Sequence, residues 1–237
     1  MLKKGIAAAI VAGCAAVFAS VAMGANIICL AGSESCTGTG EADTMAGSND
    51  VDNIFSFGGN DQILPNAGND VVNAGPGVDR VEGNDSGSDA LKLGPGGDFV
   101  NETVDLVASN TVNGGPGPDC LGGGSGDDTI RGGTGNERTG RFLCGGGYSI
   151  FGFEGDDRLI GGKGRDGIVA DEGADLLAGG KGNDYLDAKS SDGDGNDTLR
   201  CGTGKDKYSA SSRDVVAKSC EKRVPPPDPM KARVARW

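Results

Sequence analysis

Residues 161–169 read Gly161-Gly162-Lys163-Gly164-Arg165-Asp166-Gly167-Ile168-Val169, and residues 179–187 repeat the pattern as Gly179-Gly180-Lys181-Gly182-Asn183-Asp184-Tyr185-Leu186-Asp187. Both follow the scheme Gly-Gly-x-Gly-x-Asp-x-U-x, in which U is a large apolar residue. Asp157 and Asp175 stand in the same phase, so an aspartate recurs every nine residues in this part of the chain. A short fixed period indicates a repeat architecture in which each unit packs on its neighbours.

The nine-residue register extends over most of the chain, with an apolar residue two positions after nearly every acidic one. The aspartates in register are Asp43, Asp52, Asp61, Asp70, Asp79, Asp89, Asp98, Asp119, Asp128, Asp157, Asp166, Asp175, Asp184, Asp197 and Asp206. Residues 101–113 break the spacing, and there Asp105 or Asn110 can take the acidic position. Glu137 replaces an aspartate, Tyr148 follows in a later register without a carboxylate, and residues 190–193 form an insertion.

The repeat unit predicts a local structure. In a short x-U-x strand, the U side chain points to one face and its neighbours to the other. The glycine loop turns sharply through positive φ, which glycine does at little steric cost. Two strands and two loops make one turn of about 18 residues, and turns stack roughly 4.8 Å apart. We therefore predict an all-β fold: a parallel β-roll, or right-handed β-helix-like solenoid, with two repeats per turn. Asp157 and Asp175 then face one edge, and Asp166 and Asp184 the other.

A row of carboxylates and turn carbonyls repels itself unless a cation lies between its members. The chain has no histidine, and its cysteines are not grouped at metal-ligand spacing, which argues against zinc and copper. Magnesium demands tighter octahedral geometry, whereas calcium accepts about six to eight oxygens, backbone carbonyls included. The sequence therefore favours several calcium ions.

In its loops and spacing, the chain resembles the repeats-in-toxin (RTX, or hemolysin-type) family of calcium-binding nonapeptide repeats over residues 37–208. The resemblance implies a secreted bacterial stand-alone repeat protein. It also implies that the sixth-position aspartates and loop carbonyls bind calcium between stacked turns. The loops with the best-kept glycines implicate Asp119, Asp128, Asp166, Asp184 and Asp206. Looser loops add Asp52, Asp61, Asp70, Asp79, Asp98, Asp157, Asp175 and Asp197.

Composition agrees with a thin coil. The chain has 45 glycines in 237 residues, 5% aromatic residues and a formal net charge of −12. Few apolar residues and a high net charge approach the composition of disordered chains. Because calcium would neutralise the charge, we predict that the calcium-free chain is at least partly unfolded and that binding is coupled to folding. The absence of a basic stripe argues against nucleic acid as a partner.

The N-terminus predicts the location of the protein. Met1-Leu2-Lys3-Lys4 is basic, the run 5–22 is apolar, and small residues near its end offer cleavage points. This pattern predicts a signal peptide, residues 1–25, and a secreted, extracellular protein without a membrane span after cleavage. A retained membrane anchor is one alternative. A cell-surface lipoprotein acylated at Cys14 is another, since Val11-Ala12-Gly13-Cys14 resembles a bacterial lipobox, although the apolar run continues beyond it.

The remaining chain divides into an N-terminal cap (26–42), calcium-binding repeats (43–209, irregular at 101–118 and 138–156), a C-terminal cap (210–224) and a proline-rich linker with a basic tail (225–237). Seven cysteines become an even number once Cys14 is removed, which suits an oxidising compartment. Many connectivities are open, and six free thiols are the alternative. Order along the chain favours Cys29–Cys36, Cys120–Cys144 and Cys201–Cys220, the last pinning a cap over the open end of the coil.

The function classes narrow accordingly. Without histidine, the chain cannot form Ser-His-Asp, Cys-His or HExxH sites, and every candidate carboxylate pair belongs to the repeat, so we predict no enzyme. The favoured function is a secreted calcium-binding repeat protein in which calcium drives folding. The alternative is a calcium-dependent adhesive or matrix protein that binds a glycan or a cell surface. An ice-binding face ranks last, because the residues beside U are mixed instead of forming a threonine row.

Overall fold

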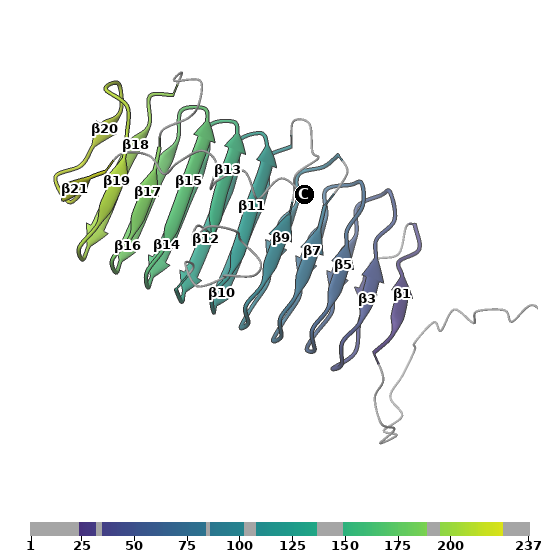
Figure 1. Ribbon diagram of the computed structural model, residues 1–237. Helices are drawn as coiled ribbons and strands as arrows, with labels where there is room; N and C mark the ends of the chain where they lie inside the picture. Colours follow the sequence, from purple (N-terminus) through teal and green to yellow (C-terminus); the bar gives the residue numbers. More distant parts are fainter. Residues whose placement is uncertain are drawn as a thin grey trace, which may run out of the picture.

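Two parallel sheets run the length of the molecule and face each other. The computed structural model describes residues 24–31, 35–83, 86–101, 108–136, 149–188 and 195–224, and within these ranges it contains strands and turns but no helix. Figure 1 shows the strands stacked in a single row from β1 at one end to β21 at the other. Odd-numbered strands form an 11-stranded sheet and even-numbered strands a 10-stranded sheet, so each turn gives one strand to each. The predicted parallel β-roll with two repeats per turn is confirmed.

We call the odd-numbered sheet sheet A and the even-numbered sheet sheet B. Sheet A contains β1 (Asn26–Ile28), β3 (Thr44–Ala46), β5 (Gln62–Leu64), β7 (Arg80–Glu82), β9 (Phe99–Asn101), β11 (Cys120–Ser125), β13 (Ile150–Glu154), β15 (Gly167–Glu172), β17 (Tyr185–Asp187), β19 (Lys207–Ser209) and β21 (Lys222–Arg223). Sheet B contains β2 (Cys36–Thr37), β4 (Asn53–Phe55), β6 (Val71–Asn73), β8 (Ala90–Lys92), β10 (Thr111–Pro116), β12 (Thr129–Thr134), β14 (Arg158–Lys163), β16 (Leu176–Lys181), β18 (Thr198–Thr203) and β20 (Val215–Val216).

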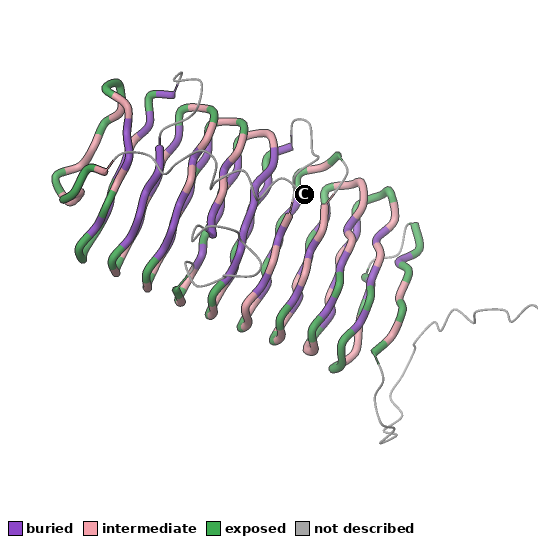
Figure 2. The backbone as a smooth tube through the Cα atoms, in the orientation of Figure 1, coloured by how far each residue is buried: buried purple, intermediate pink, exposed green. Residues whose placement is uncertain are grey.

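The U residues form the core between the sheets. In sheet A, Met45 pairs with Ile63 and Ile63 with Val81, while in sheet B Leu159 pairs with Leu177. All of these side chains are fully buried, and their neighbours along each strand are more exposed. Figure 2 shows the resulting buried stretches along the strands, between loops that are mostly partly buried or exposed. Each fully buried Ile or Leu contributes about 1.5–3 kcal/mol, so the stacked apolar residues hold the coil together.

Strand length changes partway along the coil. From β3 to β9 each strand has three residues, whereas β10, β11, β12, β14, β15, β16 and β18 have six. In sheet B the longer strands include a glycine from the loop, and these glycines pair through Gly115, Gly133, Gly162, Gly180 and Gly202. Glycine pairs therefore extend sheet B into the loops of the C-terminal part.

The segments flanking the repeats continue both sheets. β1 and β2 pair with β3 and β4, and β20 and β21 pair with β18 and β19. The predicted disulfides Cys29–Cys36 and Cys201–Cys220 are both present. Cys120 is disulfide-bonded, and its predicted partner Cys144 lies outside the described residues.

The described ranges include no helix long and apolar enough to span a membrane. The apolar run 5–22, the lipobox cysteine Cys14, Asp105, Glu137, Tyr148 and the tail 225–237 lie outside those ranges.

Candidate functional site

The aspartates of the repeat form two rows of hydrogen bonds: the sheet B row runs from Asp52 to Asp197 with Asn110 as a member, and the sheet A row has two runs, Asp43 to Asp119 and Asp166 to Asp206. Within a run, the backbone N–H of one member donates to Oδ1 of the member one turn later, over 2.8 Å from Asp52 to Asp70 and 3.0 Å from Asp166 to Asp184. One row lies at the edge before the sheet A strands and the other at the edge before the sheet B strands. As predicted, Asp157 and Asp175 share one row, and Asp166 and Asp184 share the other.

All thirteen candidate residues lie in these rows. The sheet A row contains Asp61, Asp79, Asp98, Asp119, Asp166, Asp184 and Asp206, and the sheet B row contains Asp52, Asp70, Asp128, Asp157, Asp175 and Asp197. None is more than 3% exposed. The candidates therefore lie stacked along two buried edges of the coil.

The second carboxylate oxygen of the repeat aspartates, Oδ2, differs from Oδ1 in its hydrogen bonding. Oδ2 is buried and accepts no hydrogen bond at Asp61, Asp70, Asp79, Asp98, Asp119, Asp157, Asp175 and Asp206. A buried acceptor without a donor carries its desolvation cost uncompensated, at about 1–3 kcal/mol and more when charged. Such an oxygen lacks a positively polarised partner.

Burial raises the pKa of these carboxyl groups. The pKa of Asp119 rises to about 6, that of Asp98 to about 7 and that of Asp157 to about 8, mainly by desolvation. The hydrogen bond from the backbone of the previous turn works in the opposite direction. Neighbouring aspartates raise the pKa of Asp157 further. Without a cation, the folded coil therefore holds its carboxylates at a cost near neutral pH.

The first glycine of a loop leaves a space beside the aspartate of the same loop. A Cβ atom added at Gly179 would lie 2.6 Å from Asp184 Oδ2 and 2.5 Å from the carbonyl oxygen of Cys201 in the next turn. We call this space a cradle: it is bounded by the first-position glycine, the sixth-position carboxylate and the first-position carbonyl of the next turn. At Gly179, two oxygens of different turns face a position that no side chain fills.

The oxygens at these edges come mainly from the backbone. Among the described residues, no three acidic or cysteine side chains converge on one point. Each cradle combines a single carboxylate with peptide carbonyls, and calcium, a hard ion, accepts this mixture of oxygens. The donor set and the open space therefore fit calcium, and they offer neither nitrogen nor sulfur to a softer metal.

The fourth position of the loop is glycine for a steric reason. Gly164, Gly182 and Gly204 have φ between 140° and 147°. An added Cβ at any of them would overlap the carbonyl oxygen of the corresponding residue in the previous turn. Glycine at this position lets successive loops stack backbone on backbone, and this stacking brings the cradle oxygens together.

The structure adds residues that sequence reasoning did not single out. Beside each aspartate row, the residue just before the aspartate makes a similar bond between turns. Asn60 Oδ1 accepts the Val78 N–H at 2.8 Å, and Asn183 Oδ1 accepts the Lys205 N–H at 2.8 Å. Asn69, Asp127, Asn136 and Asp156 do the same. In the sequence, the recurring Asn-Asp and Asp-Asp pairs could have indicated these additional hydrogen bonds.

The break at residues 101–113 is resolved at Asn110. Its Oδ1 accepts the Asp89 N–H at 2.9 Å, and its own N–H donates to Asp128 Oδ1 at 2.6 Å, so Asn110 holds the position of an aspartate. At the C-terminal end, Asp214 and Glu221 accept from Asp197 and Asp206 and complete the two rows.

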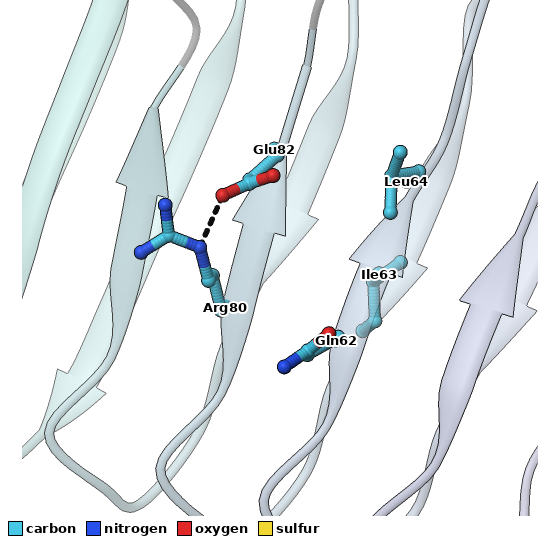
Figure 3. A pocket seen from close by; sticks show the side chains of 5 residues that line it. All are labelled: Gln62, Ile63, Leu64, Arg80 and Glu82. Atoms are coloured by element: carbon cyan, nitrogen blue, oxygen red, sulfur yellow. Dashed lines mark hydrogen bonds and ion pairs between the residues drawn. The ribbon is translucent and has the colours of Figure 1, made fainter. Parts of the chain in front are cut away.

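On sheet A, a small hollow lies between β5 and β7, lined by Gln62, Ile63, Leu64, Arg80 and Glu82. Figure 3 shows Arg80 turned toward Glu82, with which it forms an ion pair. The Arg80 guanidinium also lies 4.3 Å from the centre of the Phe99 ring on the next strand. The charged groups of the hollow are thus engaged with each other, unlike the unpaired oxygens of the edges.

Comparison with protein-family models agrees with the geometry. The model described as the RTX calcium-binding nonapeptide repeat matches four times, at residues 37–72, 66–91, 108–136 and 150–188, which together cover just over half of the chain. No curated protein gave a significant match. The matched copies contain ten of the thirteen candidate aspartates, all except Asp98, Asp197 and Asp206. The chain belongs to the RTX calcium-binding nonapeptide repeat family.

Proposed function

We propose that the protein is a secreted calcium-binding β-roll in which calcium, held in the loops between successive turns, stabilises the folded coil. The observation that carries the proposal is the unpartnered Oδ2 of buried aspartates such as Asp119 and Asp157. Each belongs to a loop whose first-position glycine leaves a cradle open. A fold that buries an acceptor without a donor there leaves room for a cation instead.

The fit to calcium rests on the residues that bound the cradle. Asp119 lies with Gly114 and the Gly132 carbonyl, and Asp157 lies with Gly152 and the Ala170 carbonyl. When bound, calcium would supply the positive charge that these oxygens lack. In the folded coil, the backbone rows fix Oδ1 of Asp119 and of Asp157 and leave Oδ2 beside the cradle, so folding itself orients these carboxylates toward the ion.

This arrangement links binding to folding. The bounding oxygens belong to turns about 18 residues apart, and an unfolded chain does not hold them together. A ligand that binds only the folded state stabilises it by mass action. Calcium therefore favours the coil over the unfolded chain, and the protein acts as a calcium-dependent folding module.

Secretion is part of the same proposal. The basic N-terminus and the apolar run of residues 5–22 support export. The disulfides Cys29–Cys36 and Cys201–Cys220 fit an oxidising compartment. Extracellular calcium modules work at about 10⁻⁴–10⁻³ M, a concentration at which a site of modest affinity is filled.

Isothermal titration calorimetry with calcium tests the proposal, with magnesium as the control ion. We expect saturable calcium binding with more than one ion per chain, and markedly weaker binding of magnesium, which demands tighter octahedral geometry. Absence of calcium binding up to about 10 mM, well above the extracellular range, would overturn the proposal.

A further inference from the structure

The cradles of the two ends of the coil differ in what occupies them. We call residues 35–101 the N-terminal section and residues 108–206 the C-terminal section. Unpartnered aspartate oxygens occur in both, for example at Asp79 and Asp157, so burial of the carboxylate does not distinguish the sections. The groups that reach the carboxylate and its cradle do, although Gly38 and Gly47 leave the same space beside Asp43 and Asp52 as the glycines of the C-terminal section.

In the first two loops of the N-terminal section, a serine or threonine forms hydrogen bonds with Oδ2 of the aspartate in the same loop. The Thr39 N–H donates to Asp43 Oδ2 at 2.6 Å, and the Ser48 N–H donates to Asp52 Oδ2 at 2.6 Å. The Ser48 hydroxyl adds a second bond to the same oxygen at 3.0 Å. The oxygen that would face a cation is already hydrogen-bonded within its own loop.

In the Asp61 loop a side-chain donor reaches the cradle carbonyl, and in the Asp70 loop the buried Pro65 takes the first position. The fully buried Ser56 hydroxyl donates to the carbonyl of Ala74 at 2.7 Å. Beside Pro65, the Asn66 amide donates to the first-position carbonyl of the previous turn, that of Gly47, at 2.7 Å. A hydrogen-bond donor pointed at a carbonyl repels a cation and replaces it as the partner of that oxygen.

In the last loops of this section, apolar side chains take the first position. Ala74 and Leu93 stand where the C-terminal loops have their first glycine, and both are fully buried in the apolar core. An ion that needs about six to eight oxygens finds a methyl or isobutyl group instead. The core thus extends into the loop and the cradle is closed.

The C-terminal section retains open cradles at five aspartates. A glycine stands at the first position before each, and a Cβ added there would lie 2.1–2.6 Å from the aspartate Oδ2, in the space that the cradle leaves open. These glycine–aspartate pairs are Gly114–Asp119, Gly123–Asp128, Gly152–Asp157, Gly161–Asp166 and Gly179–Asp184. In the same section Ala170 and Cys201 occupy the first position before Asp175 and Asp206, and both are buried, so these two cradles are closed.

We propose that calcium binds the coil only at the open cradles of Asp119, Asp128, Asp157, Asp166 and Asp184, and that the N-terminal section folds without it. This inference rests on the proposed function and narrows it. The N-terminal section replaces the ion with its own hydroxyl, amide and apolar groups. It therefore forms a metal-independent end on which the calcium-dependent turns assemble.

Hydrogen–deuterium exchange of the intact chain, with calcium and with a chelator, tests the inference. We expect the amides of β3–β9 to be protected in chelator and to change little with calcium. Amides of β12–β16 should exchange rapidly in chelator and become protected when calcium is added. Equal calcium-dependent gains in both sections would overturn the inference and leave the proposed function intact. No calcium effect in either section would overturn both.

A pair of variants tests the cradle itself. Gly179→Ala places a methyl 2.6 Å from Asp184 Oδ2, and the natural Ala170 shows that the loop accommodates alanine at this position. Gly97→Ala is the matched control, because its Cβ would have nothing closer than the Pro118 carbonyl oxygen at 3.4 Å. We expect Gly179→Ala to bind one calcium ion fewer than the parent chain and Gly97→Ala to bind the same number. Unchanged stoichiometry in Gly179→Ala would overturn the assignment.

Discussion

At the scale of single residues, the two oxygens of each repeat aspartate have separate tasks. Oδ1 accepts a backbone N–H from the previous turn, and this bond needs no charge, since Asn110 makes it with an amide oxygen at 2.9 Å. Oδ2 lies beside the cradle, where a negative charge is useful only if a cation is present. The coil therefore needs the shape of the residue, whereas calcium binding needs its charge.

Replacing Asp157 by asparagine separates these tasks. Asp157→Asn keeps an Oδ1 acceptor for the Asp128 N–H and removes a carboxyl group whose pKa burial raises to about 8. We expect calcium affinity to fall by at least the roughly 10-fold that loss of a metal's outer partner costs. Stability in chelator should be unchanged or higher. Calorimetry and urea unfolding measure the two quantities, and a large loss of stability in chelator would contradict this division.

Ser56, in contrast to Asp157, should matter for the stability of the fold and not for calcium binding. Ser56→Ala removes the donor to the buried Ala74 carbonyl, so we expect a loss of about 1–3 kcal/mol in the free energy of unfolding of the N-terminal section. The loss should be equal with and without calcium, because this section has no open cradle. The exposed Ser86→Ala serves as the control in urea unfolding. A loss that appears only in calcium would show that Ser56 supports a metal site.

At the scale of strands and loops, the spacing of the sequence predicted most of the fold. Nine-residue register fixed which residues enter the core, from Met45 to Leu199, and placed the aspartates on two edges. It also offered Asp105 or Asn110 as the substitute at the break, and Asn110 takes that place in the row. The occupants of the cradles could not be predicted in the same way. Ser and Asn are ordinary turn residues, and whether Asn66 reaches the Gly47 carbonyl depends on a turn 19 residues away.

The loops also predict a pH dependence for the metal-free protein. Burial raises the pKa of Asp70 to about 6, of Asp98 to about 7 and of Asp157 to about 8, all above the value of about 4 expected in an unfolded chain. The stabilisation from protonating these groups is complete below pH about 4 and is lost as pH rises through about 6 to 8. Urea unfolding in metal-free buffer should therefore give higher stability at about pH 5.5 than at about pH 8.5, each roughly half a unit outside the titration range of about 6 to 8. The reverse order would contradict the cause assigned to these shifts.

The last strands depend on a covalent link. Cys201 in β18 is bonded to Cys220, which lies between β20 and β21. Replacing both with alanine should cost roughly 2–4 kcal/mol, typical of a disulfide closing a loop of this size. Exchange should accelerate mainly in residues 210–224. Uniform acceleration along the whole coil would show that the link stabilises more than this end.

At the scale of the whole molecule, the coil combines a thin apolar core with a formal net charge of −12. Stacked turns contact mainly their neighbours, so stability is divided along the axis and need not be lost all at once. The N-terminal section fills its own cradles, and the C-terminal section leaves them to calcium. We expect two unfolding transitions in chelator and convergence toward one at saturating calcium, since the ion stabilises only the weaker section.

The most direct test of coupled binding and folding is a calcium titration of the purified protein followed by far-ultraviolet circular dichroism. The account predicts a partial β signal in chelator that grows with calcium and saturates at about 10⁻⁴–10⁻³ M, the range of extracellular modules. A full β signal in chelator that calcium leaves unchanged, in intensity and in thermal midpoint, would contradict it. The apolar core and the disulfides would then hold the coil alone.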